Sequence, residues 1–218
     1  FGQLGSITYA FQNCYLNTDK TNPSFLKVMN TSENDYSRYL FFYLENTIRN
    51  NELKKAIELS SNIDLLSSTL LIAQSKIWID QNKFKELGKY FSCRNENDIL
   101  AEFFFLIANL FSSQENFRQS NFYLSISNFL NPKFYFNLTL FVENYYDNNN
   151  YNLAKKFLDE FDKNNEIYSW YRTKKKAQIL IKEDKKDLSL NLIEKKFKEL
   201  KNPSIRIQYE LANIYKNF

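Results

Sequence analysis

The chain has 218 residues, 44% hydrophobic and 25% charged, with a net charge of +4 and no histidine. This balance is ordinary for a folded protein and excludes a chain that is disordered throughout. Basic and acidic residues are interleaved, which argues against a dedicated nucleic-acid surface. The chain holds only 3 Gly and 3 Pro, without an Asn-Gly or Asp-Gly pair, so tight strand hairpins are disfavoured and helices are expected.

The residue types needed for catalysis are sparse. Without histidine the chain lacks the commonest general base and metal ligand. The Gly2 and Gly5 pair does not have the spacing of a phosphate-binding loop. Asp159 and Glu160 stand beside Lys155 and Lys156, which is the pattern of a solvated helix face. We therefore expect a non-enzymatic protein without a cofactor or metal.

Cysteine and apolar patterns set two further expectations. Cys14 and Cys93 lie far apart and form no CxxC motif, so we expect two buried free thiols rather than a disulfide or a zinc site. The longest apolar run, from Ile99 to Phe111, is interrupted by polar residues and is too short to cross a bilayer. No membrane-spanning segment is expected.

Residues 1–35 predict one or two helices, or a degenerate repeat that ends near Asn30. The clearest helical pattern follows later, at residues 101–134. Phe104, Ile107 and Phe111 recur at intervals of three and four residues, as on one face of a helix. After the polar break at 112–116 a second helical pattern runs from Phe117 to Asn131, where Pro132 closes it.

This helix–turn–helix unit recurs along the chain. With Ala108 as the marker of the first helix, the equivalent positions are spaced 31 to 35 residues apart. The first-helix markers are Leu44, Ser75, Ala108, Val142, Ala177 and Ala212. The second-helix markers, each twelve residues further on, are Ala56, Leu87, Ser120, Ala154 and Ser189.

The 101–134 segment resembles the tetratricopeptide repeat (TPR) family at nine positions. These are Phe104, Ile107, Ala108, Phe111, Phe117, Ser120, Leu124, Ser127 and Pro132. The resemblance covers about residues 36–218. The array as a whole is similar to the repeat arrays of alphaproteobacteria. It implies an all-α fold, an α-solenoid of about five stacked helix pairs followed by an unpaired helix. Large residues stand at three markers, Leu44, Leu87 and Val142, where the family has small ones, so those units are degenerate.

The resemblance also implies a mode of action. In this family the first helices line a concave groove that binds an extended peptide or a partner's helix. Counted from the markers, the groove candidates are Phe105, Asn109, Thr139, Glu143, Tyr146, Lys174, Gln178, Tyr209 and Asn213. Amides at three of these positions could pair with a peptide backbone. Lys174 and Arg206 match the family's carboxylate-binding pattern only loosely, so that activity is not expected.

Two other functions remain open. The array could be a structural spacer in a larger chain, or its basic stretch at residues 172–186 could bind nucleic acid, although the acidic residues within that stretch favour a solvated face. The partner's identity does not follow from the sequence. We expect a protein of the bacterial cytoplasm or periplasm. Because the last predicted helix lacks a covering helix, we also expect a longer chain.

Overall fold

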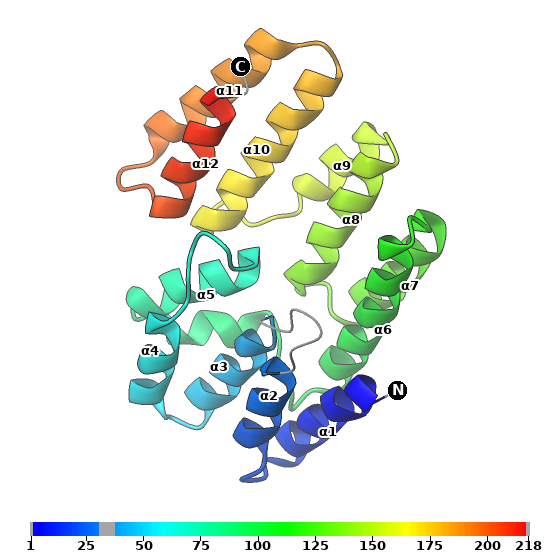
Figure 1. The fold of residues 1–218 in the computed structure, drawn as a ribbon, viewed down its shortest axis with the longest axis vertical. Coiled ribbons are helices and arrows are strands. Elements are labelled where there is room, and N and C mark those ends of the chain that lie inside the picture. The colour runs from blue at the N-terminus through cyan, green and yellow to red at the C-terminus, as the bar shows by residue number, and fades with distance from the viewer. Residues whose placement is uncertain (1, 31–37, 217–218) are drawn as a thin grey trace.

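The structure is a computed structural model that describes residues 2–30 and 38–216. Within these ranges every regular element is a helix, and helices adjacent in sequence pack against each other (Figure 1). The predicted all-α, solenoid-like fold is confirmed. In chain order the helices are α1 (Gly2–Leu16), α2 (Thr21–Met29), α3 (Tyr39–Arg49), α4 (Leu53–Ser61), α5 (Leu70–Asp80), the 3₁₀-helix η1 (Phe84–Lys89), α6 (Glu96–Ser113), α7 (Phe117–Leu130), α8 (Tyr135–Asp147), α9 (Tyr151–Leu158), α10 (Glu166–Lys182), α11 (Lys186–Glu199) and α12 (Ile205–Lys216).

The repeat markers lie where two helices approach each other. All five second-helix markers are fully buried, and so are the first-helix markers from Leu44 to Val142. Ala177 is also buried. Ala212 on α12 is exposed, because no second helix follows α12 within the described residues. The register predicted from the sequence therefore coincides with the helix contacts of the array.

The two helices of each pair are joined by a turn with the same backbone motif. Among the described residues, positive φ at a non-glycine residue occurs at Asn17, Asn51, Asn82, Glu115, Asn149 and Asp184, one at the end of each first helix from α1 to α10. At every one of these turns the next N–H donates to the carbonyl five residues earlier, over 2.7 to 3.1 Å. This is the Schellman motif, which satisfies the last carbonyls of a helix. The turn at Asn17 places α1 and α2 in the same register as the later pairs.

The third pair departs from the expected pattern. Leu87 was predicted to lie on an α-helix, but η1 is a short 3₁₀-helix of six residues. The helix ends early because the chain has to carry Phe91 into the core, where its ring lies 4.6 Å from that of Phe42. At Gly88 η1 packs against α3, and a Cβ there would make ordinary van der Waals contact, 3.6 Å from side-chain atoms of Glu45 and Arg49.

The array curls back on itself instead of extending in one direction. The backbone N–H of Ile167 on α10 donates to Gln74 Oε1 on α5 over 2.9 Å. Arg206 on α12 donates to the carbonyls of Leu65 and Ser68, before α5. In a regular solenoid each repeat contacts only its neighbours. Here the third pair meets the last helices, and Figure 1 shows α5 beside the start of α10 and of α12.

The curl fills the space between the first helices with aromatic side chains. The rings of Tyr90 and Tyr168 each lie 4.6 Å from that of Tyr135, in edge-to-face geometry. Fully buried aromatic residues in this core include Tyr39, Phe41, Phe42, Phe91, Phe134 and Tyr168. The expected concave groove is therefore closed where the first helices begin.

An ion pair lies within this aromatic core. Arg38, directly before α3, pairs with the fully buried Glu102 of α6, which also accepts a hydrogen bond from the Tyr39 hydroxyl over 3.1 Å. The Arg38 guanidinium lies 4.7 Å from the centre of the Phe105 ring and 5.0 Å from that of Phe136. Burial lowers the pKa of Arg38. Because a separated charge would be left unpaired in an apolar site, this contact holds α3 and α6 together.

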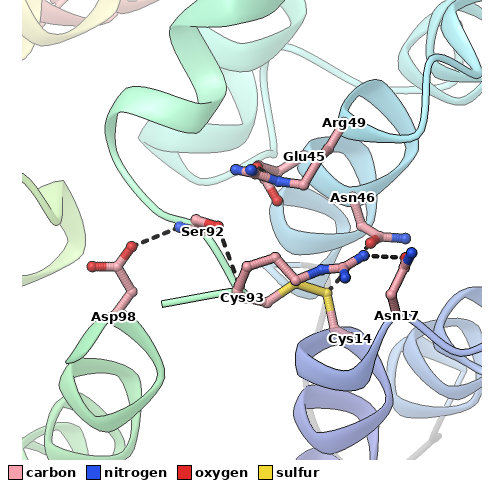
Figure 2. Close-up of polar contacts among 9 residues, drawn as sticks. Cys14, Asn17, Glu45, Asn46, Arg49, Ser92, Cys93 and Asp98 are labelled. Atoms are coloured by element: carbon pink, nitrogen blue, oxygen red, sulfur yellow. Dashed lines mark hydrogen bonds and ion pairs between the residues drawn. A yellow bond between two sulfur atoms is a disulfide. The ribbon is translucent and has the colours of Figure 1, made fainter. Parts of the chain in front are cut away.

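The two cysteines contradict the sequence prediction. Cys14 at the end of α1 and Cys93 before α6 form a disulfide, and both are buried (Figure 2). The prediction of free thiols failed because sequence spacing does not reveal that the chain returns to α1 after η1. Arg94, the next residue, donates to Asn17 Oδ1 at the first turn. Two contacts thus fix the start of α6 to the first helix pair.

The turn residue Glu115 offers a test of the repeated motif. A residue with a Cβ is disfavoured at positive φ, and Asn tolerates it better than Glu. Glu115→Gly should therefore raise the free energy of unfolding by about 1 kcal/mol, measured by urea denaturation. Asn149→Gly is the matched control and should give a smaller gain. A Glu115→Gly variant less stable than the parent would contradict the left-handed turn.

Candidate partner-binding face

Seven of the nine groove candidates lie on α8, α10 and α12. Side-chain contacts link these three first helices in sequence, from α8 to α10 and from α10 to α12. We call the surface formed by the six candidates on these helices that remain after Thr139 is set aside the first-helix face. It comprises Glu143 and Tyr146 on α8, Lys174 and Gln178 on α10, and Tyr209 and Asn213 on α12.

Glu143 is the junction between α8 and α10. Its carboxylate accepts a hydrogen bond from the Tyr171 hydroxyl over 2.7 Å and an ion pair from Lys175 Nζ over 2.6 Å. The same ammonium lies 4.4 Å from the centre of the Tyr146 ring. Burial, reinforced by the Glu143 charge, raises the pKa of Tyr171 well above its usual value, so the phenol remains a donor. These contacts fix the orientation of Tyr146 and Glu143.

Glu210 is the corresponding junction between α10 and α12. It accepts from Lys174 Nζ over 2.8 Å, from Trp170 Nε1 over 2.9 Å and from Arg206 Nε over 3.1 Å. Burial alone would raise the pKa of Glu210, but Lys174 and Arg206, together with the indole N–H, hold it below its usual value. Charges of opposite sign thus alternate from one helix to the next along the face.

The remaining positions of the face have unused polar groups. Gln178 is half-buried, and its buried Oε1 has no hydrogen-bond partner in the described structure. Tyr209 is 55% exposed, and Asn213 is exposed. Asn213 therefore offers an amide that a peptide backbone could pair with, whereas the Gln178 Oε1 atom is covered by the chain itself.

Three of the nine candidates do not belong to this face. Phe105 was predicted to point into the groove, but it is buried against Phe136 and the Arg38 guanidinium. Thr139 is half-buried and donates to the Tyr135 carbonyl of its own helix over 2.9 Å. Asn109 is exposed on α6 and so lies outside the three helices that form the face.

The sequence reasoning missed the residues that join the helices. Lys175 and Glu210 each stand two residues before a marker, a slot that was not counted as facing the groove. Opposite charges on successive first helices were a usable signal, although each pair joins different slots: Lys175 pairs with Glu143, one residue after its marker, and Glu210 pairs with Lys174, three residues before its marker. Tyr171 gave no such signal, since its contact with Glu143 depends on how closely α8 and α10 pack.

The basic stretch at residues 172–186 is largely neutralised by carboxylates. Arg172 and Lys176 both pair with Asp159, directly after α9, while Lys174 and Lys175 pair with Glu210 and Glu143. Lys185 pairs with Glu183. Cations already held by carboxylates are poorly placed to neutralise phosphates. This arrangement disfavours the nucleic-acid alternative.

In residues 2–30 and 38–216 no helix is long and apolar enough to cross a membrane. The same ranges contain no group of three His, Cys, Asp or Glu residues placed to hold a metal ion. Arg206 and Lys174, the loose match to a carboxylate-binding pattern, are engaged within the chain by Glu210 and by backbone carbonyls.

The chain has no significant match among protein-family models, curated proteins or solved structures. The functional interpretation therefore depends on the geometry of the chain itself.

The Glu210 junction predicts a pH dependence of stability. Because its pKa is lowered in the folded chain, the carboxylate stabilises the fold above pH 4.5, and this contribution is lost as the pH falls through the folded pKa. Glu210→Gln should cost about 1–2 kcal/mol in free energy of unfolding at neutral pH, and less in acid. Urea denaturation over a pH series measures the difference. As a control, Glu199→Gln at the exposed end of α11 should change little, and an equal cost of both variants would contradict the role of Glu210.

Proposed function

We propose that the chain is a TPR-like, non-catalytic interaction module that binds an extended peptide or helix of a partner protein on the first-helix face. The observation that carries the proposal is the pair of ordered ion-pair junctions, Lys175–Glu143 and Lys174–Glu210, on a face that also holds the exposed Tyr209 and Asn213. The exposed amide of Asn213 could pair with a peptide backbone, as amide side chains commonly do.

The chemistry around Gln178 supports a protein partner. Tyr146 and Tyr209 offer flat rings with a polar end, a combination enriched in protein interfaces. The Lys175 ammonium holds the ring of Tyr146 in place, so little side-chain entropy would be lost when a partner binds there. The alternating charges at Glu143, Lys174 and Glu210 would favour a partner segment of mixed rather than uniform charge.

A selection from a random peptide library displayed on phage tests this proposal. Selected peptides should bind the wild type and bind Gln178→Ala/Tyr209→Ala/Asn213→Ala at least about 10-fold more weakly, as measured by fluorescence anisotropy. The matched control replaces three exposed residues of α11, Leu188→Ala/Asn191→Ala/Lys195→Ala, and should bind as the wild type does. Circular dichroism confirms that both triple variants are folded.

Two outcomes would overturn the proposal. Peptides that bind the first triple variant as tightly as the wild type would place the site elsewhere on the chain. A selection that enriches no peptide above background would favour the spacer function instead.

We also propose that the chain works in an oxidising compartment, which among the expected locations favours the periplasm. The support is the buried Cys14–Cys93 disulfide, since such bonds persist outside the reducing cytosol. Protein taken from its source without reductant and then denatured should resist alkylation by iodoacetamide until dithiothreitol is added. Cys14→Ser should lower the free energy of unfolding by about 2–4 kcal/mol, because the bond closes a long loop. Two thiols alkylated before reduction would contradict this.

A further inference from the structure

The α6–α7 hairpin presents a large apolar surface to solvent. On α7 the side chains of Phe122 and Phe129 are 62% and 85% exposed, and on α6 that of Leu110 is 57% exposed. Leu100 and Ile107 of α6 are exposed as well. We call these five residues the hairpin face. A typical monomer exposes few contiguous apolar patches of this kind, and large ones mark interaction sites.

The hairpin face is continuous across the two helices. Tyr123 lies in the seam between them, with its ring 5.5 Å from Phe111 and parallel to it, and 6.3 Å from Phe104. On its other side Phe122 meets Tyr123 edge to face at 5.3 Å. Half-buried rings thus connect the exposed residues of α6 with those of α7, and the seam is rigid before any partner arrives.

The curl of the array leaves this face without a neighbouring pair. In a regular solenoid α6 and α7 would pack between the third and fifth pairs. Instead α6 and α7 pack chiefly on each other and on α8, while α5 and η1 pack on α3 and α10. Figure 1 accordingly shows α7 at an edge of the molecule, with α8 on one side of the hairpin.

The outer side of α7 is suited to a copy of itself. Phe122 and Phe129 are separated by two helical turns, with the small Ser125 between them. The Ser125 hydroxyl donates to the Asn121 carbonyl over 2.8 Å, so it can be covered without losing a hydrogen bond. Between Arg118 and Lys133 the chain has no charged residue. A two-fold contact sets residue i of one copy against residue j of the other and j against i, so an uncharged surface leaves no unpaired or like charges in the contact.

We propose that two copies of the chain associate through the hairpin face, with the α7 helices antiparallel across a two-fold axis near Ser125. Phe122 of one copy then packs on Phe129 of its partner, and the reverse contact follows by symmetry. The five side chains of the hairpin face together expose roughly 500 Å² of surface per copy, if a fully exposed side chain has a surface of about 200 Å². With the half-buried seam and a polar rim this approaches the roughly 800 Å² per partner of a stable interface.

Sedimentation velocity over a concentration series tests the pairing. The wild type should form dimers, and Phe122→Lys or Phe129→Glu alone should weaken the association at least about 10-fold, because each variant places an unpaired charge against a ring. The double variant Phe122→Lys/Phe129→Glu should recover much of the affinity. In the antiparallel arrangement it sets opposite charges against each other at both ends of the contact.

The matched control uses exposed apolar residues on another helix. Ile205→Lys/Tyr209→Glu on α12 changes two residues that are 61% and 55% exposed and four positions apart. This variant should dimerise as the wild type does. All four substituted positions are exposed, so circular dichroism and thermal melting should show the same folded chain in each case.

Several outcomes would overturn the proposal. A wild type that stays monomeric at about 1 mM excludes the dimer, since a specific pair should associate more tightly than this. Loss of dimers in the α12 variant would place the contact there. A double variant no better than the single ones would rule out the antiparallel arrangement. A monomer that sediments with phosphatidylcholine and phosphatidylglycerol vesicles, but not after Phe122→Lys, would assign the face to a lipid surface.

Discussion

The left-handed residue at the end of each first helix is the constraint on which the array depends. A helix pair joined by so short a turn can pack in few ways, and the Schellman hydrogen bonds select the same way six times. With few glycines available, Asn takes this position in four of the six turns. Because every pair leaves its turn in the same geometry, the markers of successive pairs meet in the same contacts and the stack can form.

The long-range contacts close a stack of helix pairs that would otherwise extend in one direction. The Arg38–Glu102 ion pair, the Cys14–Cys93 disulfide and the Gln74 contact each join parts of the chain more than sixty residues apart. They close the curl around an aromatic core, so α3, α5, α8 and α10 have little free surface at their beginnings. A partner is left with the first-helix face on α8, α10 and α12.

The two proposed surfaces differ in physical character. The first-helix face is polar and internally paired, so binding there would depend on hydrogen bonds made without breaking the ion-pair junctions. The hairpin face is apolar and uncharged, so association there would depend on the area of surface removed from water. The two faces lie on different helices, and these helices meet where α8 packs on α7. A dimer and a bound peptide are therefore compatible in one assembly.

The sequence by itself determined the all-α fold, the repeat register and most positions on the first helices. These features follow from helix periodicity and turn residues, which can be recognised within a stretch of 35 residues. The tertiary structure alone decided that Phe105 is buried, that Leu87 lies on a short 3₁₀-helix and that the two cysteines are bonded. Each of these depends on segments that lie apart in the sequence: Phe105 packs on Phe136 and the Arg38 guanidinium, η1 packs on α3, and Cys14 is bonded to a cysteine 79 residues further on. A periodic pattern does not predict such contacts. It describes how each helix pair packs on the next and not which distant segments of the chain meet.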